Sequence, residues 1–394
     1  MKTSQFIALL VAIAVAVTVV VLSFGTRPRL DNDSIELQTV EQTSQNKPLQ
    51  TSVSMLAVGD NLIHKPIYEQ AQARSGDDSY NFMPVYENLA GMIAAADIAV
   101  INQETMMAKS YSVSTYPCFN TPTTMAGQLS TLGFDVLTIA NNHMLDKESF
   151  GLIETLDLIN GTDGLLAAGA FHGREEYTQI KTVTVNDISF AFLAYTESTN
   201  GFTLPESKES YIVYTSELDD VKQQVEYANK IADVVVVSMH AGEEYNDKEN
   251  ENQRKFAQNV VNWGADLVIG THPHTLQPVE YVANAEGKEV PVLYSLGNFV
   301  SAQNKPKRLI GGMANVTFTK NYVTGEVTVS KPQLDIVITH YGSGFSGIKL
   351  YRLADYTDAL AASHGVGGFS TDYIYNHIRT VIGDEYLIDE YKSK

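Results

Sequence analysis

Cysteine is nearly absent from this sequence of 394 residues, which has only Cys118. One cysteine cannot form an internal disulfide or a thiolate cluster, so any metal site must use carboxylate, imidazole and amide groups. Basic residues are also scarce, because 27 Lys and Arg stand against 46 Asp and Glu, which gives a formal net charge of −19. Since nucleic acid is bound through a basic face, this balance argues against nucleic acid as the main partner.

Several common functional motifs are missing as well. The sequence has no P-loop, no nucleophile elbow and no dinucleotide-binding glycine fingerprint. Apolar residues make up 44% of the chain, a composition that excludes a disordered, collagen-like or coiled-coil protein. A chain of this length can bury a substantial core without disulfides.

The longest apolar run lies near the N-terminus. Residues 6–24 carry no charge and only two polar side chains, Thr18 and Ser23. This length can cross a hydrocarbon core of about 30 Å, whereas the apolar part of a cleaved signal peptide usually has about 7 to 15 residues. We therefore predict a transmembrane helix that anchors the chain over residues 1–25, with the globular part outside the cell. A cleaved signal peptide is the alternative.

The next segment has a different composition. Residues 26–52 are rich in Gln, Thr, Ser, Asn and Asp and contain no aromatic residue, so they cannot bury enough apolar surface to fold alone. We predict a polar tether over this segment. The remainder reads as one globular unit, with a main domain over residues 53–302 and its C-terminal part over residues 303–394.

Short apolar runs recur in the globular part, and each ends in polar residues. The runs are 55–58, 98–101, 136–140, 234–239, 267–269 and 292–296. Between several of them lie stretches with helical periodicity, such as residues 149–160 and 249–263. Alternating strands and helices predict an α/β protein with a largely parallel sheet. Ligand residues of such sheets lie beyond the carboxyl ends of the strands, so the six polar clusters are expected to converge.

Converging clusters would bring carboxylates, an amide and imidazoles together. The residues concerned are Asp60, Glu104, Asn142, His143, His240, Glu244, His272 and His274. This mixture is typical of sites for divalent Mn, Fe or Zn. Singly, Asp60 could belong to a turn and Asn142 could cap a helix. His272 and His274 are more informative, because imidazoles two positions apart in an extended segment project to the same side.

The clusters form an ordered series of six motifs. They are Gly59-Asp60, Asn102-Gln103-Glu104, Asn141-Asn142-His143 with Asp146, the segment 240–245, the segment 270–274 and the segment 294–299. The series resembles that of the CapA/PgsA capsule-synthesis proteins, whose PGA_cap domains belong to the calcineurin-like metallophosphoesterase superfamily. The resemblance covers roughly residues 54–302. It implies a four-layer α/β/β/α sandwich with a two-metal site at one edge.

The resemblance also implies a role for each matching residue. The implied metal ligands are Asp60, Glu104 as the bridging carboxylate, Asn142, His240, His272 and His274. His143 would be the acid that protonates a leaving oxygen. Asp146 and Glu244 would lie beside these groups, as ligands or as residues that orient an imidazole.

Three departures bear on catalysis. Leu62 stands where the superfamily usually has a histidine ligand, Glu104 replaces the usual aspartate, and Ala241 replaces a tryptophan. One metal position therefore has fewer ligands, so the sequence leaves open whether one or two ions bind.

The resemblance predicts a membrane-anchored extracellular protein that serves synthesis or export of a poly-γ-glutamate-type capsule polymer. Its expected partners are the anionic polymer, the membrane and other capsule-synthesis membrane proteins. Two alternatives stay open: an extracellular metal-dependent phosphoesterase acting on a phosphoester unrelated to capsule, and a non-catalytic scaffold with a degenerate site. At a net charge of −19 the chain should repel a polyanion except near bound metal.

Overall fold

The structure is a computed structural model that describes residues 49–77, 79–204 and 210–392. The predicted anchor over residues 1–25 and most of the predicted tether lie outside the described residues. Among the described helices, none combines the length and apolar character needed to cross a bilayer. Residues 48–394 form one compact unit.

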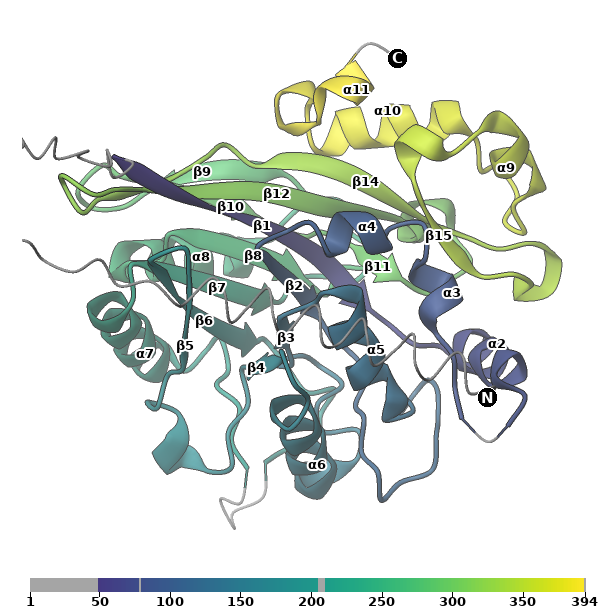
Figure 1. The fold of residues 1–394 in the computed structure, drawn as a ribbon, viewed down its shortest axis with the longest axis horizontal. Helices are drawn as coiled ribbons and strands as arrows, with labels where there is room; N and C mark the ends of the chain where they lie inside the picture. The colour runs from purple at the N-terminus through teal and green to yellow at the C-terminus, as the bar shows by residue number, and fades with distance from the viewer. Residues whose placement is uncertain (1–48, 78, 205–209, 393–394) are drawn as a thin grey trace, which may run out of the picture. The chain divides into compact units, whose positions relative to one another are not determined.

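Nine strands form the larger sheet (Figure 1). They are β1 (Gln50–Asn61), β2 (Ile98–Asn102), β3 (Val136–Thr138), β4 (Leu166–Ala168), β11 (Asn298–Val300), β12 (Ile310–Asn321), β13 (Val327–Val329), β14 (Gln333–His340) and β15 (Lys349–Arg352). The order is β15-β14-β12-β1-β2-β3-β4, with β11 beside β1 and β13 beside β12. Strands β1 to β4 are parallel, whereas β12, β14 and β15 continue the sheet in antiparallel fashion.

Six strands form the second sheet, in the order β5-β6-β7-β8-β10-β9. They are β5 (Thr182–Val185), β6 (Ile188–Thr196), β7 (Val234–His240), β8 (Leu267–Thr271), β9 (Val279–Ala283) and β10 (Glu289–Leu293). Strands β6, β7, β8 and β10 are parallel to one another, and β5 and β9 are antiparallel edge strands.

Helices α2 to α8 lie between strands in the sequence, and α9 to α11 follow the last strand, β15. They are α2 (Lys65–Ser75), α3 (Met83–Tyr86), α4 (Ala90–Ile93), α5 (Thr124–Leu132), α6 (Glu148–Asn160), α7 (Leu218–Ile231), α8 (Glu251–Trp263), α9 (Asp358–Ser363), α10 (Thr371–Val381) and α11 (Asp389–Lys392). Helix α8 begins with a capping box, in which Asn250 and Gln253 each bond the other's backbone N–H.

The two sheets face each other. Successive side chains of β7 point alternately to the two faces of its sheet, and each face packs in a different core. Val234 and Val236 join the core that includes the nine-stranded sheet, whereas Val235 and Val237 pack in a second core with α7 and α8. Across the sheet interface, the rings of Phe190 on β6 and Phe318 on β12 lie 5.1 Å apart. The mixed α/β architecture predicted from the sequence is confirmed, and it contains two facing sheets.

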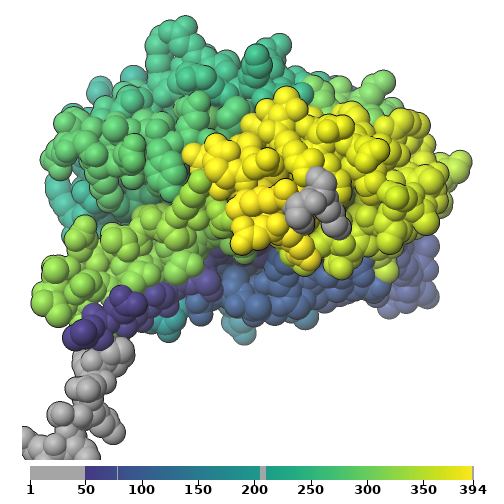
Figure 2. Space-filling view, turned by 90° about the horizontal axis from the view of Figure 1, so that it is seen from above, coloured from purple at the N-terminus to yellow at the C-terminus, as the bar shows by residue number. Residues whose placement is uncertain are grey.

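The C-terminal part, residues 303–394, contributes β12 to β15 to the nine-stranded sheet and then forms α9 to α11. Figure 1 shows these helices in yellow beside β12 and β14, and Figure 2 shows the same segment at the surface next to the green strands. Ile388 donates its N–H to the carbonyl of Leu334 on β14, and the Tyr391 hydroxyl donates to Asp335. These bonds hold the C-terminal segment on the sheet.

Two glycines allow backbone segments to approach closely near the carboxyl ends of the strands. A Cβ atom on Gly59 would lie 1.8 Å from the carbonyl oxygen of Gly297, and one on Gly270 would lie 1.9 Å from that of Tyr294. No side chain fits at either position without backbone movement. Both glycines precede predicted ligand residues, so the close approach sets the positions of those ligands.

Candidate metal centre

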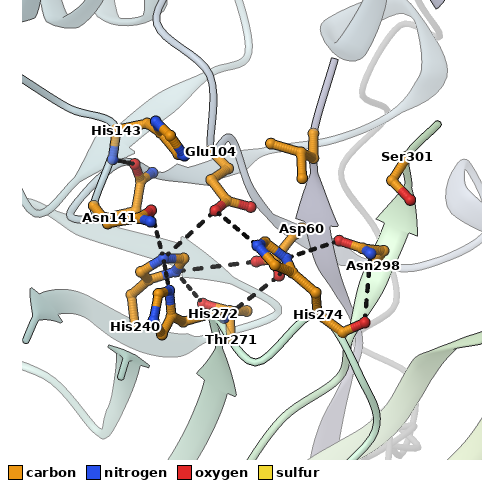
Figure 3. A network of polar contacts seen from close by, with 12 residues as sticks. Asp60, Glu104, Asn141, His143, His240, Thr271, His272, His274, Asn298 and Ser301 are labelled. Carbon is orange, nitrogen blue, oxygen red and sulfur yellow. Dashed lines mark hydrogen bonds and ion pairs between the residues drawn. The ribbon is translucent and has the colours of Figure 1, made fainter. Parts of the chain in front are cut away.

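The predicted ligands converge at the carboxyl ends of strands from both sheets (Figure 3). The nine-stranded sheet supplies Asp60 at the end of β1, Glu104 after β2 and Asn142 after β3. The six-stranded sheet supplies His240 at the end of β7, with His272 and His274 after β8. Oxygen donors therefore come from one sheet and nitrogen donors from the other.

Asp60, Glu104 and His274 form the first group of candidate ligands. Each offers one atom within 4.8 Å of the others, and all three side chains are buried. His274 Nδ1 lies 3.1 Å from Asp60 Oδ2, and His274 Nε2 lies 3.7 Å from Glu104 Oε1. This group could hold one divalent ion.

Glu104, His240 and His272 form the second group, under the same distance criterion. His240 Nε2 lies 3.7 Å from Glu104 Oε1 and 3.2 Å from His272 Nδ1. Asn142 belongs beside this group, because its Oδ1 lies 3.1 Å from the same His240 nitrogen. Glu104 is common to both groups, which is the position of a bridging carboxylate.

The surroundings of Glu104 indicate whether the site suits a cation. Both of its carboxylate oxygens are buried and have no hydrogen-bond partner among the residues that the structure describes. Burial raises the pKa of Glu104 well above its usual value, and the negative charge of Asp60 raises it further. Buried carboxylates are normally paired or coordinate a metal. The donor set therefore fits a divalent ion shared by the two groups.

The imidazoles differ in protonation. Burial lowers the pKa of His240 well below its usual value and that of His272 to about 4, with neighbouring imidazoles adding to both effects. Burial alone would also lower the pKa of His274, but the carboxylates of Glu104 and Asp60 outweigh it and raise this pKa to about 9. Neutral imidazole is the ligand form, so a metal would displace the His274 proton.

Polar residues that the sequence reasoning gave no role orient the ligands. Thr271 Oγ1 lies 2.9 Å from His240 Nδ1, and Asn298 Oδ1 lies 3.0 Å from His274 Nδ1. Asn102 donates its amide N–H to Asp60 Oδ1 at 2.8 Å. Such partners fix ring orientation and ligand basicity. Their position in the sequence is the available signal, because all three residues lie inside the six motifs.

The segment after β8 differs from the extended conformation expected for it. His272 has φ of 98° and His274 has φ of 57°, in the region that favours glycine. The backbone is therefore not extended as expected, although the two rings lie 6.1 Å apart at the same site, and each belongs to a different group. Backbone strain of this kind is typical of functional sites.

His143 and Asp146 form a buried pair next to the second group. His143 Nδ1 lies 2.8 Å from Asp146 Oδ2, which also accepts the Phe119 N–H at 2.6 Å. The Phe119 ring meets the His143 ring edge to face, 4.7 Å away. Asp146 thus fixes the orientation of His143, as the sequence predicted for a neighbouring residue. The candidate ligand Asn142 directly precedes His143 in the sequence, so the backbone links the pair to the centre.

Glu244 belongs to neither group of candidate ligands. Its side chain is exposed, and among the described residues it forms no hydrogen bond or ion pair with a site imidazole. Burial raises the pKa of Tyr245 to about 12, and the nearby charge of Glu244 contributes to this increase. The role expected of Glu244, as a ligand or as a residue that orients an imidazole, stays a prediction.

Leu62 is buried, and its apolar side chain offers no ligand atom at the position where the superfamily usually has a histidine. His64 belongs to neither ligand group. Burial lowers its pKa to about 4, and its Nδ1 lies 3.2 Å from the Ala302 N–H and 3.1 Å from the Leu62 carbonyl. It packs against Phe119, with ring centroids 5.5 Å apart.

The fold and the ligand set define a class of α/β proteins with a candidate two-ion centre at a sheet edge. Residues 54–303, more than half of the chain, match the family model described as bacterial capsule synthesis protein PGA_cap. The chain belongs to this family, in agreement with the resemblance seen in its motifs.

Curated relatives carry corresponding names. The chain is 32% identical over 202 residues to the PGA biosynthesis protein CapA of Bacillus subtilis, which covers 49% of each chain. It is 34% identical over 175 residues to the capsule biosynthesis protein CapA of Bacillus anthracis, covering 43% of this chain and 41% of that one. The matched region thus spans about half the length of these relatives.

Two solved structures are similar at low identity. A putative 5'-nucleotidase from Staphylococcus aureus has a TM-score of 0.45 at 17% identity and covers 72% of this chain and 54% of that chain. A phosphatase from Mycoplasma pneumoniae has a TM-score of 0.44 at 13% identity and covers 73% of this chain and 94% of that chain.

Proposed function

We propose that this protein is a capsule-synthesis accessory protein of the cell surface that handles an anionic polymer of the poly-γ-glutamate type through a divalent-metal centre. The observation that carries the proposal is the buried Glu104 carboxylate, whose oxygens accept no hydrogen bond from the described residues and which belongs to both groups of candidate ligands. The family membership supports the capsule process. The proposed ligands are Asp60, Glu104, Asn142, His240, His272 and His274, holding one or two ions of Mn, Fe or Zn.

We also propose that residues 6–24 anchor the chain in the cell membrane, with the described residues outside. The charge-free run of this segment supports the anchor. In that position the domain could act on polymer as it leaves the cell, together with other membrane proteins of capsule synthesis.

A divalent ion in the centre would act as a Lewis acid that attracts a carboxylate or phosphoryl oxygen and stabilises negative charge. The chain's own groups prepare the site for that task. Thr271 holds Nδ1 of His240, so Nε2 faces the centre. Asp146 holds Nδ1 of His143, which leaves Nε2 of His143 to give or take a proton.

A second candidate function is favoured by the His143–Asp146 pair. A histidine with one nitrogen fixed by a buried carboxylate suits a general acid, so the centre could hydrolyse an extracellular phosphoester. The missing imidazole at Leu62 favours the opposite outcome, in which the metal binds substrate with little turnover. The two candidates therefore differ in turnover and agree in metal binding.

Metal analysis of the purified full-length chain tests the shared part of the proposal. We expect about one or two equivalents of transition metal in the parent protein. Glu104→Gln removes the common ligand, so we expect roughly a tenfold or greater loss of metal affinity. Glu244→Gln is the matched control, because it removes an exposed carboxylate near the centre, and it should retain the metal. A parent protein without metal would contradict the proposal.

Two assays then separate the functions. Binding of poly-γ-glutamate that disappears on chelation, with no turnover of a generic phosphodiester, supports the polymer-handling protein. Turnover that falls at least about a hundredfold in His143→Ala, with metal content unchanged, supports the phosphoesterase. Polymer binding that survives complete removal of the metal would refute the first candidate.

A further inference from the structure

Arg308 is a cation that has no acidic partner among the described residues of a strongly acidic protein. Six arginines lie among the described residues. Carboxylates pair with four of them, namely Arg174, Arg254, Arg352 and Arg379. Arg74 donates to the Gln70 side chain. The guanidinium of Arg308 forms no hydrogen bond or ion pair within the described part of the chain, although its Nε is buried.

Arg308 contacts the ring of Tyr245, which in turn lies near the candidate ligand His274. Its Cζ atom is 3.3 Å from the centroid of the Tyr245 ring, which is 6.0 Å from the centroid of the His274 ring. A guanidinium stacked on an aromatic face is held in orientation while its N–H groups stay available at the edge. Stacking therefore positions the cation without using its hydrogen-bonding groups.

The backbone gives a second connection to the centre. Asn298 donates its amide N–H to the carbonyl oxygen of Arg308 at 2.9 Å. The other end of the same amide, Asn298 Oδ1, lies 3.0 Å from Nδ1 of the candidate ligand His274. One side chain thus sets the position of a ligand and of the unpaired cation together.

The Tyr245 platform is itself fixed. Tyr245 has φ of 67°, donates its N–H to the Pro273 carbonyl at 2.7 Å and accepts a bond from Lys307 Nζ at 2.6 Å. Lys307 also pairs with Asp247 at 3.0 Å, so its charge is already used within the protein. Of these two adjacent cations, only Arg308 is left for a ligand. A rigid support of this kind lowers the entropy lost when a ligand binds.

We propose that Arg308, stacked on Tyr245, is a substrate-binding residue that forms a bidentate contact with an oxyanion group of the molecule bound at the metal centre. The guanidinium fork matches the geometry of carboxylate and phosphate oxygens. This inference rests on the proposed function, and it explains how a chain with a net charge of −19 can attract an anion at one place. Arg308 lies beyond residues 54–303, the range that the family model matches.

Binding measurements on the full-length, metal-loaded protein test this role. The probes are poly-γ-glutamate for the carboxylate and inorganic phosphate for the phosphate. Arg308→Gln should weaken binding of the recognised probe by about tenfold or more, because one charge-assisted contact is lost. Arg308→Lys should recover only part of this loss, since lysine keeps the charge but not the fork. The probe that responds identifies the oxyanion.

Arg254→Gln is the matched control, since Arg254 pairs with Glu249 and Glu280 on the surface and its loss changes the net charge equally. It should bind like the parent protein. Metal content and melting temperature should be unchanged in Arg308→Gln, which separates substrate binding from structural support of His274. If Arg308→Gln binds the probes as well as the parent protein does, or if this variant loses its metal, the role of Arg308 is overturned. The proposed function would stand in either case. Failure of the parent protein to bind either probe would refute the proposed function together with this role.

Discussion

Glu104 illustrates at the scale of single residues why the centre is adapted to a ligand. Both of its carboxylate oxygens are buried without a hydrogen-bond partner among the described residues, and the nearest imidazole nitrogens, on His240 and His274, lie 3.7 Å from Oε1. A buried polar group without a hydrogen bond costs about 1–3 kcal/mol, and Asp60 adds like-charge repulsion nearby. A cation in the proposed site would offset both penalties and would so couple metal binding to folding stability.

This coupling gives a prediction in which stability and function change in opposite directions. Glu104→Met replaces the carboxylate with an apolar side chain of similar length. We expect it to raise the free energy of unfolding of the chelated protein by roughly 1–3 kcal/mol and to abolish stabilisation by added metal. Urea unfolding with and without chelator measures both effects. Glu244→Met, at an exposed position, should shift either value by less than about 0.5 kcal/mol. A chelated Glu104→Met protein less stable than the parent would contradict this account.

The residues of the centre could be predicted where the chemistry is local. Asp60, Asn142 and the histidines follow apolar runs, so their convergence follows from the strand ends alone. Sequence does not distinguish an exposed carboxylate such as Glu244 from a buried one within a single polar cluster, and it does not reveal that the Thr271 hydroxyl contacts His240. The sequence does not single out Arg308, because its lack of a hydrogen-bond partner among the described residues is visible only in the structure.

At the scale of elements, glycines determine how closely the strand ends approach. The Cα of Gly59 faces the carbonyl of Gly297, and that contact holds the end of β1 next to the segment before β11. Asp60 follows directly and donates its N–H to the same carbonyl at 2.9 Å. The first metal ligand is therefore positioned by a backbone contact that tolerates no side chain.

We expect Gly59→Ala to destabilise the protein by about 1–3 kcal/mol, because the added methyl group overlaps the Gly297 carbonyl and forces the strands apart. Metal affinity should fall as well, since Asp60 moves with the backbone. Thermal unfolding and metal titration measure the two effects. Gly91→Ala in α4 is the control, because nothing lies within 4 Å of its added Cβ atom, and it should be neutral or stabilising. Equal behaviour of the two variants would refute the explanation.

The two helices and six apolar runs predicted from the sequence all overlap elements of the structure, and the departures have physical reasons. Helices α6 and α8 lie close to the predicted ranges 149–160 and 249–263. Strand β1 begins at Gln50, inside the range assigned to the tether, because polar residues there pair with β12, as the Ser52–Thr319 hydroxyl contact at 2.9 Å shows. Periodicity detects burial, so it does not detect a strand end that is stabilised by polar pairing.

For the whole molecule, the net charge of −19 governs the approach of an anionic partner. Long-range repulsion between like charges slows association, and salt screens it over a Debye length of about 10 Å at 0.1 M. In the proposed complex, short contacts at the metal centre and at Arg308 would govern dissociation instead. The two effects can therefore be separated by kinetics.

We expect the association rate constant for poly-γ-glutamate to rise several-fold when the salt concentration increases from about 10 mM to about 150 mM, because the repulsion is screened. A basic protein would show the reverse. Stopped-flow or surface-based kinetics on the metal-loaded full-length chain measure this rate, and the same series with a neutral polymer controls for nonspecific salt effects. A rate constant that falls steadily with salt would show that local basic groups dominate the approach.

The division of donor atoms between the two sheets has a consequence for how the protein matures. Every oxygen ligand precedes residue 143, and every imidazole ligand follows residue 239. A nascent chain that ends between these points holds acids without imidazoles, so it cannot discriminate a transition metal from abundant hard cations. Under the proposed function, selective loading of a transition metal would have to wait until His274 has been synthesised and the second sheet has docked, which would make metal capture a late checkpoint of biogenesis.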